Sequence, residues 1–482
     1  AVAKIELWGA QVCVRKVGSY AAITDASHRE TVEEALKLSA EVPEALAPWG
    51  AWLAEKDVAA VILAPGVKLL AVQVPVGIQV LKSSMAQANE QAKQAAAVFD
   101  VYAKLFEAMG KEVSSAGFGA RLDEQGVLHI TKRARLVPDG SWARLAALVK
   151  PAKENLLAGL PAEPFVAAGG GSLPEEIWEP LMRASLDMMK SMPNIYGLNA
   201  EQIDQMPKTS ITSMKKVRGL SMVMGVGPKG ASLYSKMVIV MRVEKSDAFM
   251  AEYDVAIKEY SEFLKKVNSP VLQPIEVEKT EIDGAPALQM TMNVPKQPVE
   301  LQGPRHSEMM EAMFGPGGKI KIWAVPADEH TVVIGYVTKE PLQQAIRAIR
   351  QGTPGLAGDA DVAKTAALLP ANAPWIGFWS PRATIELVKQ LIPAFAPKGA
   401  KDEITILEFA KTPPIGFAAT TAPGEVQGHM VVPAEVLKEI GQYATKAKSQ
   451  AKPPKTKVSE NGVSVRGRVT LNGKPLGTPA KI

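Results

Sequence analysis

The chain has 482 residues, of which 47% are hydrophobic and 22% charged, a composition typical of well-packed globular protein with roughly two to four domains. Its single cysteine, Cys13, excludes an intrachain disulfide and a thiolate metal site. The formal net charge of +5 is small, but residues 442–482 carry nine basic side chains and one acidic side chain.

The predicted elements fall into three kinds of segment, and each kind recurs along the chain. The first kind is a pair of strands and a helix, the second a buried strand and a helix, and the third a hairpin that begins at glycine and leads into a helix. Segments of the first kind cover residues 4–38 and 319–350. Those of the second kind cover 58–106, 159–192 and 368–392. Those of the third kind cover 117–150, 219–266 and 415–448.

Tight turns are predicted where glycine follows a turn-forming residue. The three hairpins of the third kind turn at Gln125-Gly126, Lys229-Gly230 and Pro423-Gly424. An extra hairpin over Ile275–Val294 turns at Asp283-Gly284, and a short C-terminal one turns at Asn472-Gly473. Gly169-Gly170-Gly171 is predicted to be a flexible turn within a linker over residues 167–174.

The repeats predict an α+β fold of three related lobes, each an antiparallel β-sheet covered by helices and each arising from internal duplication. We expect a first lobe at 1–158, a second, Met-rich lobe at 159–310, and a third at 311–450 that repeats the first. Residues 451–482 are expected to be a basic linker and a short β-hairpin.

No catalytic constellation is recognisable in the sequence. The five histidines lack metal-ligand spacing, and no nucleophile has a credible base nearby in sequence. The sequence therefore predicts no catalytic residues, no metal, no cofactor and no enzymatic activity.

Methionine is concentrated in the middle of the chain, with 16 of the 19 between residues 182 and 313. A Met-filled core, a groove for an apolar ligand and a protein interface are all consistent with such a cluster. For the groove, the predicted ligand-binding residues are Trp178, Met182, Met189, Met192, Met309, Met310 and Met313.

The basic tail predicts contact with an anionic wall or membrane surface through Lys446, Lys448, Lys452, Lys455 and Lys457. The alternative is a solvated tail. Nucleic acid is not an expected partner, because no aromatic side chain interleaves these lysines. No transmembrane segment is predicted, since uncharged stretches such as Leu69–Leu81 fall short of about 18 residues.

The chain begins Ala-Val-Ala, which is consistent with removal of a signal peptide and export to the periplasm or cell surface. A chain trimmed for other reasons would begin in the same way.

The Leu160-Pro-Ala-Glu-Pro164 strand and the hairpin from Gly117-Phe-Gly-Ala-Arg-Leu-Asp-Glu-Gln-Gly126 resemble segments of exported multi-repeat proteins of planctomycete bacteria, a domain of unknown function. The tail from Val465 to Leu476 resembles the opening strands of a small envelope-type β-domain. The resemblance implies fold and export, and it brings no activity or catalytic residues. The order of elements is also analogous to that of the periplasmic lipoprotein-carrier fold.

These observations predict a non-enzymatic exported envelope protein that acts as a binding or assembly scaffold. Its expected partners are other envelope proteins, a second copy of itself or lipid. The alternative is a periplasmic carrier of a hydrophobic ligand, lipid or lipoprotein, in a Met-lined groove.

Overall fold

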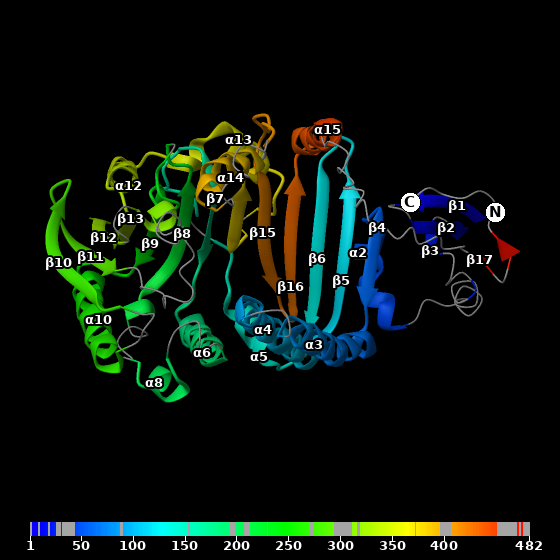
Figure 1. The fold of residues 1–482 in the computed structure, drawn as a ribbon, viewed down its shortest axis with the longest axis horizontal. Helices are drawn as coiled ribbons and strands as arrows, with labels where there is room; N and C mark the ends of the chain where they lie inside the picture. Colours follow the sequence, from blue (N-terminus) through cyan, green and yellow to red (C-terminus); the bar gives the residue numbers. More distant parts are fainter. Residues whose placement is uncertain are drawn as a thin grey trace, which may run out of the picture.

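The computed structural model describes residues 2–7, 10–17, 20–25, 30, 44–86, 90–152, 155–191, 198–206, 213–228, 230–268, 273–293, 311–315, 319–371, 373–395, 406–450, 470–471 and 474–475. Thirteen of the described strands form one antiparallel sheet, with β10 at one edge and β4 at the other (Figure 1). Their order across the sheet is β10-β11-β12-β13-β9-β8-β7-β14-β15-β16-β6-β5-β4.

The strands of this sheet are β4 (Val58–Ile62), β5 (Val113–Leu122), β6 (Leu128–Leu136), β7 (Phe165–Ser172), β8 (Val217–Gly225), β9 (Met237–Val243), β10 (Ile275–Ile282), β11 (Ala285–Asn293), β12 (Lys319–Asp328), β13 (Thr331–Tyr336), β14 (Trp375–Trp379), β15 (Ile415–Ala422) and β16 (Glu425–Val432). A separate three-stranded sheet contains β1 (Val2–Leu7), β2 (Ala10–Val17) and β3 (Tyr20–Asp25), and β17 (Thr470–Leu471) pairs with β18 (Lys474–Pro475).

One arrangement of elements occurs three times: a strand, one or more helices, a hairpin and a closing helix. In each case the first strand pairs with the first strand of the hairpin, so that β4-β5-β6, β7-β8-β9 and β14-β15-β16 are adjacent triplets. The predicted α+β class is confirmed.

The prediction of three lobes with separate sheets is wrong, because the three triplets share one sheet. β6 pairs with β16, and β7 pairs with β14. A sheet of three strands would leave two rows of backbone hydrogen-bonding groups unpaired, and joining the triplets satisfies those rows. The hairpin β12–β13, which was assigned to the third lobe, lies between β11 and β9.

Three of the predicted hairpin turns agree with the structure, whereas the predicted tight turn at Lys229-Gly230 is wrong, because β8 ends at Gly225 and β9 begins only at Met237. Gly126, Gly284 and Gly424 all have positive φ, as does Asp283, which precedes Gly284. Glycine adopts this conformation without the steric cost of a Cβ, which explains its place at these turns.

The three glycines at 169–171 lie in the second half of β7, so the predicted flexible turn is wrong. A Cβ at Gly171 would lie 2.3 Å from the ring of Trp375, and one at Gly170 would lie 2.6 Å from the Leu156 carbonyl oxygen. These glycines therefore allow close packing on both faces of a central strand.

Helices pack on both faces of the sheet. Leu342 and Ile346 of α12 (Glu340–Gln351) pack with Val333 on the first face. Phe249 of α10 (Ser246–Val267) packs with Ile334 on the second face. Val333 and Ile334 are neighbours on β13, and successive side chains of a strand point to opposite faces.

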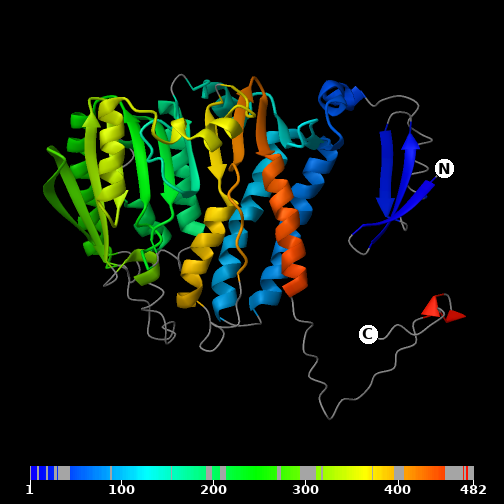
Figure 2. The ribbon, with the colours of Figure 1, turned by 90° about the horizontal axis from the view of Figure 1, so that it is seen from above.

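The remaining helices with a place in this arrangement are η2 (Glu44–Trp49), α2 (Gly50–Ala54), α3 (Ala64–Ala86), α4 (Glu90–Glu112), α5 (Ser141–Leu148), α6 (Glu175–Ser191), α8 (Ala200–Asp204), η5 (Gly355–Gly358), α13 (Ala360–Ala366), α14 (Pro381–Phe395) and α15 (Ala434–Gln450). Four of them, α3, α4, α14 and α15, run away from the strands on one side of the sheet (Figure 2). They therefore leave part of that face uncovered.

Candidate interaction surface

The end of the sheet at β4 has two different faces, and the first is closed by tryptophan. Trp49 of η2 is fully buried and lies 5.4 Å from Trp52 of α2, measured between ring centroids. A Cβ on Gly117 of β5 would come within 2.5 Å of the Trp49 ring. The glycines of the Gly117-Phe118-Gly119 segment thus form a flat floor for two indole rings.

A partly buried ion pair lies at this corner. Arg133 of β6 lies over the Trp49 ring at 5.1 Å and donates to Glu425 of β16 at 2.6 Å. Burial raises the pKa of the Glu425 carboxyl, but hydrogen bonds from Arg133 and Gln427 outweigh this effect and hold the pKa below its usual value. The carboxylate is therefore charged at neutral pH and binds two strands of different triplets together.

On the second face, seven large apolar side chains of β4, β5, β14 and β15 are exposed. They are Val58, Ile62, Phe118, Leu122, Trp375, Trp379 and Phe417, which we call the open face. Side chains of cross-strand pairs share a face, and the pairs Ala60–Phe118, Phe118–Lys132, Lys132–Gly428, Gly428–Ala419 and Ala419–Trp375 connect β4 to β14. The seven side chains therefore share one face of the sheet, with Lys132 of β6 and Gly428 of β16 between the β4–β5 group and the β14–β15 group.

Helix α3 adds a second exposed apolar surface beside the open face. Leu69, Val72, Val76 and Val80 are exposed and recur at intervals of three, four and four residues, which places them on one side of the helix; we call them the α3 stripe. On the inner side, α3 packs so closely on α4 that a Cβ at Gly110 would lie 2.4 Å from Cβ of Ala71.

By length and composition, residues 64–84 of α3 could cross a membrane. Their mean hydropathy is 1.4, and only a small share of them is buried. Among the described residues, one helix is long and apolar enough to cross a membrane, and it is α3. The prediction of no transmembrane segment rests on the shortness of uncharged stretches such as Leu69–Leu81, and it stays a prediction.

The predicted ligand-binding residues are not brought together in one groove. Trp178 is 5% exposed and donates its indole N–H to the Val217 carbonyl at 2.9 Å, so it belongs to the core. Met189 is partly buried in a different cluster with Phe263, and Met182 and Met313 are half-buried. Met192, Met309 and Met310 lie outside the described residues.

Other methionines of the cluster fill the core. Met241 and Met290 are each 3% exposed and pack with Phe249 on the second face. Of the three alternatives for the methionine cluster, a core, a groove and a protein interface, Met241 and Met290 support the core.

Of the predicted anionic-surface contacts, Lys446 is exposed near the end of α15. Lys452, Lys455 and Lys457 lie outside the described residues, as does the side chain of Lys448. Helix α15, which carries Lys446, runs away from the sheet on the same side as α3 (Figure 2).

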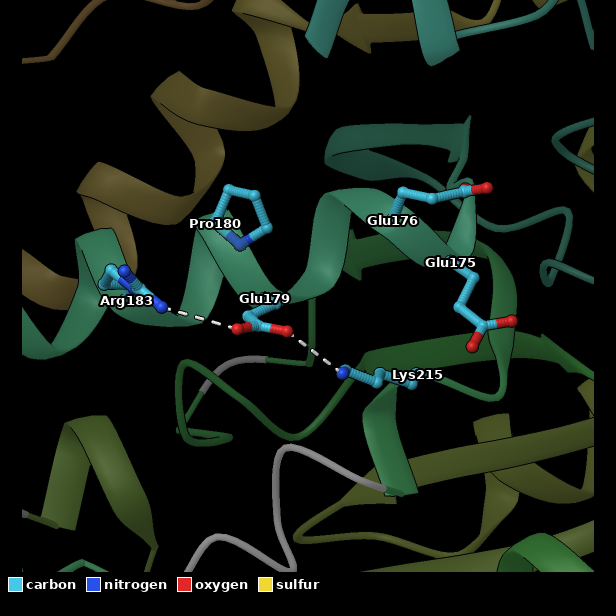
Figure 3. Close-up of a pocket in the computed structure, with 6 residues that line it drawn as sticks. All are labelled: Glu175, Glu176, Glu179, Pro180, Arg183 and Lys215. Atoms are coloured by element: carbon cyan, nitrogen blue, oxygen red, sulfur yellow. Dashed lines mark hydrogen bonds and ion pairs between the residues drawn. The ribbon is translucent and has the colours of Figure 1, made fainter. Parts of the chain in front are cut away.

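A surface pocket of about 780 Å³ lies along α6 and is lined mainly by charged side chains. Figure 3 shows that Glu179 lies between Arg183 and Lys215, with N–O distances of 3.4 and 3.2 Å. The hydrogen bond from Lys215 and its charge lower the pKa of Glu179. Exposed pairs of this kind contribute little binding or stability, and the two cations of the lining are already used by one carboxylate.

No group of three or more His, Cys, Asp or Glu side chains within the described ranges has metal-holding geometry. His129 contacts Asp123 at 2.9 Å in the β5–β6 turn, and Asp123 also accepts the N–H groups of Gln125 and Val127. This carboxylate is committed to the turn.

No family model, curated protein or solved structure matches the chain.

The sequence analysis missed the open face and the α3 stripe. The stripe had a signal, since Leu69, Val72, Val76 and Val80 follow the helical period in a segment with few charges. The open face had no signal in the sequence, because Phe118 and Trp375 are exposed only where no described helix covers that part of the sheet.

Proposed function

We propose that this protein is a non-enzymatic exported protein of the bacterial cell envelope that binds and assembles envelope components. The α3 stripe docks on a lipid surface, and the open face of the protein binds envelope components. The basic tail, through Lys446, Lys448, Lys452, Lys455 and Lys457, adds attraction to anionic groups.

The observation that carries this proposal is the extent of exposed apolar surface at one end of the sheet. Monomeric soluble proteins rarely expose large contiguous apolar patches, and such patches mark sites for partners or membranes. Val72, in the middle of the α3 stripe, is 67% exposed, although it lies in a 23-residue helix. An exposed apolar helix and a basic segment in one chain together suit an anionic lipid surface.

The test is sedimentation with vesicles of phosphatidylethanolamine and phosphatidylglycerol. The double variant Val72→Glu/Val76→Glu should bind at least about tenfold more weakly, because burying two valine side chains in lipid contributes roughly 3 kcal/mol to binding. Its free energy of unfolding should stay within about 0.5 kcal/mol of wild type, since both positions are exposed.

The matched control is Val255→Glu, which charges an exposed valine on α10 at the far end of the sheet. It should bind vesicles as wild type does. Equal loss in both variants, or no binding by wild type, would contradict the proposal.

A carrier of a hydrophobic ligand is the second candidate, and the open face favours it more than the methionines do. Trp375, Trp379 and Phe417 offer aromatic surface on one sheet face. Native mass spectrometry that finds the 51.4 kDa chain with an added lipid-sized mass would support the carrier, and a bare chain mass would not.

We also infer that the three strand–helix–hairpin–helix units descend from one ancestral unit by duplication. The supporting observation is that β4-β5-β6, β7-β8-β9 and β14-β15-β16 share both chain order and pairing. The resemblance to planctomycete exported proteins is consistent with a repeated, exported fold.

A further inference from the structure

The outer edge of β4 has no partner strand among the described residues, since β4 pairs with β5 alone. The Ala120 carbonyl accepts the N–H of Asp57 at 2.9 Å, and the N–H of Leu122 donates to the Asp57 carboxylate at 2.7 Å. The even-numbered residues of β5 therefore direct their backbone groups toward β4.

This alternation fixes which groups of β4 face outward. Ala60 lies opposite Phe118, so its N–H and C=O bond to β5. Its neighbours Ala59 and Val61 consequently direct their N–H and C=O groups away from the sheet. These four groups are equally spaced about Ala60.

The two edges of the sheet differ in charge. β10 has four charged residues among its eight (Glu276, Glu278, Lys279 and Glu281), whereas β4 reads Val-Ala-Ala-Val-Ile and has none. Charged side chains on an edge strand discourage pairing with another chain. The β10 edge has this protection, and the β4 edge lacks it.

We propose that β4 pairs antiparallel with β4 of a second copy of this chain across a two-fold axis at Ala60. Ala59 then lies opposite Val61 of the second copy, and Val61 opposite Ala59 of the second copy, which forms four backbone hydrogen bonds. The spacing of the outward groups about Ala60 is what makes the edge complementary to itself.

The side chains agree with this register. Val58 lies opposite Ile62 of the second copy, and both positions are exposed members of the open face. Apolar cross-strand pairs stabilise an antiparallel ladder. The two open faces also become one continuous surface across the axis.

This inference deepens the assembly part of the proposed function and rests on it only for the use of the joined surface. The two stand or fall separately: Val72→Glu/Val76→Glu tests lipid docking and leaves β4 intact, whereas the variants below alter β4 and leave the α3 stripe intact.

The first experiment is oxidative crosslinking in full-length chain carrying Cys13→Ser, which removes the other thiol. Ala60→Cys should give a disulfide-linked dimer, because directly opposed non-hydrogen-bonded residues have Cα atoms about 4.5 Å apart, within disulfide range. Ala59→Cys is the matched control. Ala59 lies diagonal to its own copy, beyond the roughly 7 Å limit, and should crosslink at least about tenfold less.

The second experiment is native mass spectrometry, in which wild type should have twice the mass of the 51.4 kDa chain. Ala59→Pro removes an outward N–H that β5 does not use, so the single chain should fold, with an unchanged melting curve, and remain monomeric.

Three results would each overturn the proposal. They are a single-chain mass for wild type, equal crosslinking of Ala59→Cys and Ala60→Cys, and a dimer that persists in Ala59→Pro. A different occupant of this edge, such as residues 1–43 of the same chain, would give the first of these results.

Discussion

Trp49 is a fully buried side chain at the β4 end of the sheet, and its position depends on the missing Cβ of a neighbouring glycine. Gly117 has no Cβ, so the indole ring lies directly on the backbone of β5. The sequence motif Gly-Phe-Gly was recognisable as part of a hairpin. Its packing role was not, because Trp49 lies 68 residues earlier in the chain and nothing local links the two.

Gly117→Ala should destabilise the fold by about 1–3 kcal/mol, the usual range for overpacking a core. The new Cβ would lie 2.5 Å from the Trp49 ring, which Trp52 and Arg133 hold from two sides. Urea denaturation followed by tryptophan fluorescence measures the loss.

Gly77→Ala is the control for this substitution. Gly77 is exposed in α3, and a Cβ there meets nothing within 4 Å. It should stabilise the chain by up to about 1 kcal/mol through helix propensity. Loss of stability at both positions would contradict the packing role of Gly117.

Among the elements, hairpins could be predicted from sequence and the joins between triplets could not. The turns at Gln125-Gly126 and Asp283-Gly284 have local signals in residues that adopt positive φ. The pairing of β6 with β16 has no such signal, since the two strands are about 290 residues apart in the chain and no short turn links them. The glycines of β7 were misread for a related reason: their partner, Trp375, is remote in sequence.

The join between β6 and β16 should depend on pH through Glu425. Its folded pKa is below the ordinary value, so the carboxylate contributes its full stability above the ordinary glutamate pKa of about 4.3 and loses it as pH falls through the lower folded pKa. Glu425→Gln cannot show this dependence. The wild-type advantage in free energy of unfolding should therefore shrink between about pH 6 and pH 3.

Denaturant unfolding of the two proteins across this range provides the measurement. Glu262→Gln is the control, because its exposed ion pair with Lys265 should give a much smaller change. An advantage that grew on acidification would contradict the assigned direction.

At the scale of the whole molecule, the α+β class followed from sequence, whereas the single sheet and its uncovered end did not. Periodicity shows which residues prefer burial, but coverage of a face depends on the direction in which each helix leaves the sheet. For α3, α14 and α15 that direction is away from the open face (Figure 2).

The basic tail acts at this scale as well. Residues 451–482 carry seven basic side chains and one acidic one, so their deletion changes the formal net charge from +5 to −1. Binding to phosphatidylglycerol-containing vesicles at low salt should weaken about tenfold or more, because each basic residue near an anionic surface contributes about 1 kcal/mol. Binding that neither weakens on deletion nor depends on salt would remove the tail from the function.

The charged residues of β10 have a consequence for how large an assembly becomes. A sheet that is receptive at both edges polymerises into filaments, with no natural end to its growth. Here Glu276, Glu278, Lys279 and Glu281 close one edge, so joining two chains through β4 leaves only closed edges at the extremities. Raising the protein concentration should thus convert monomer to dimer and then stop, giving a fixed copy number of two.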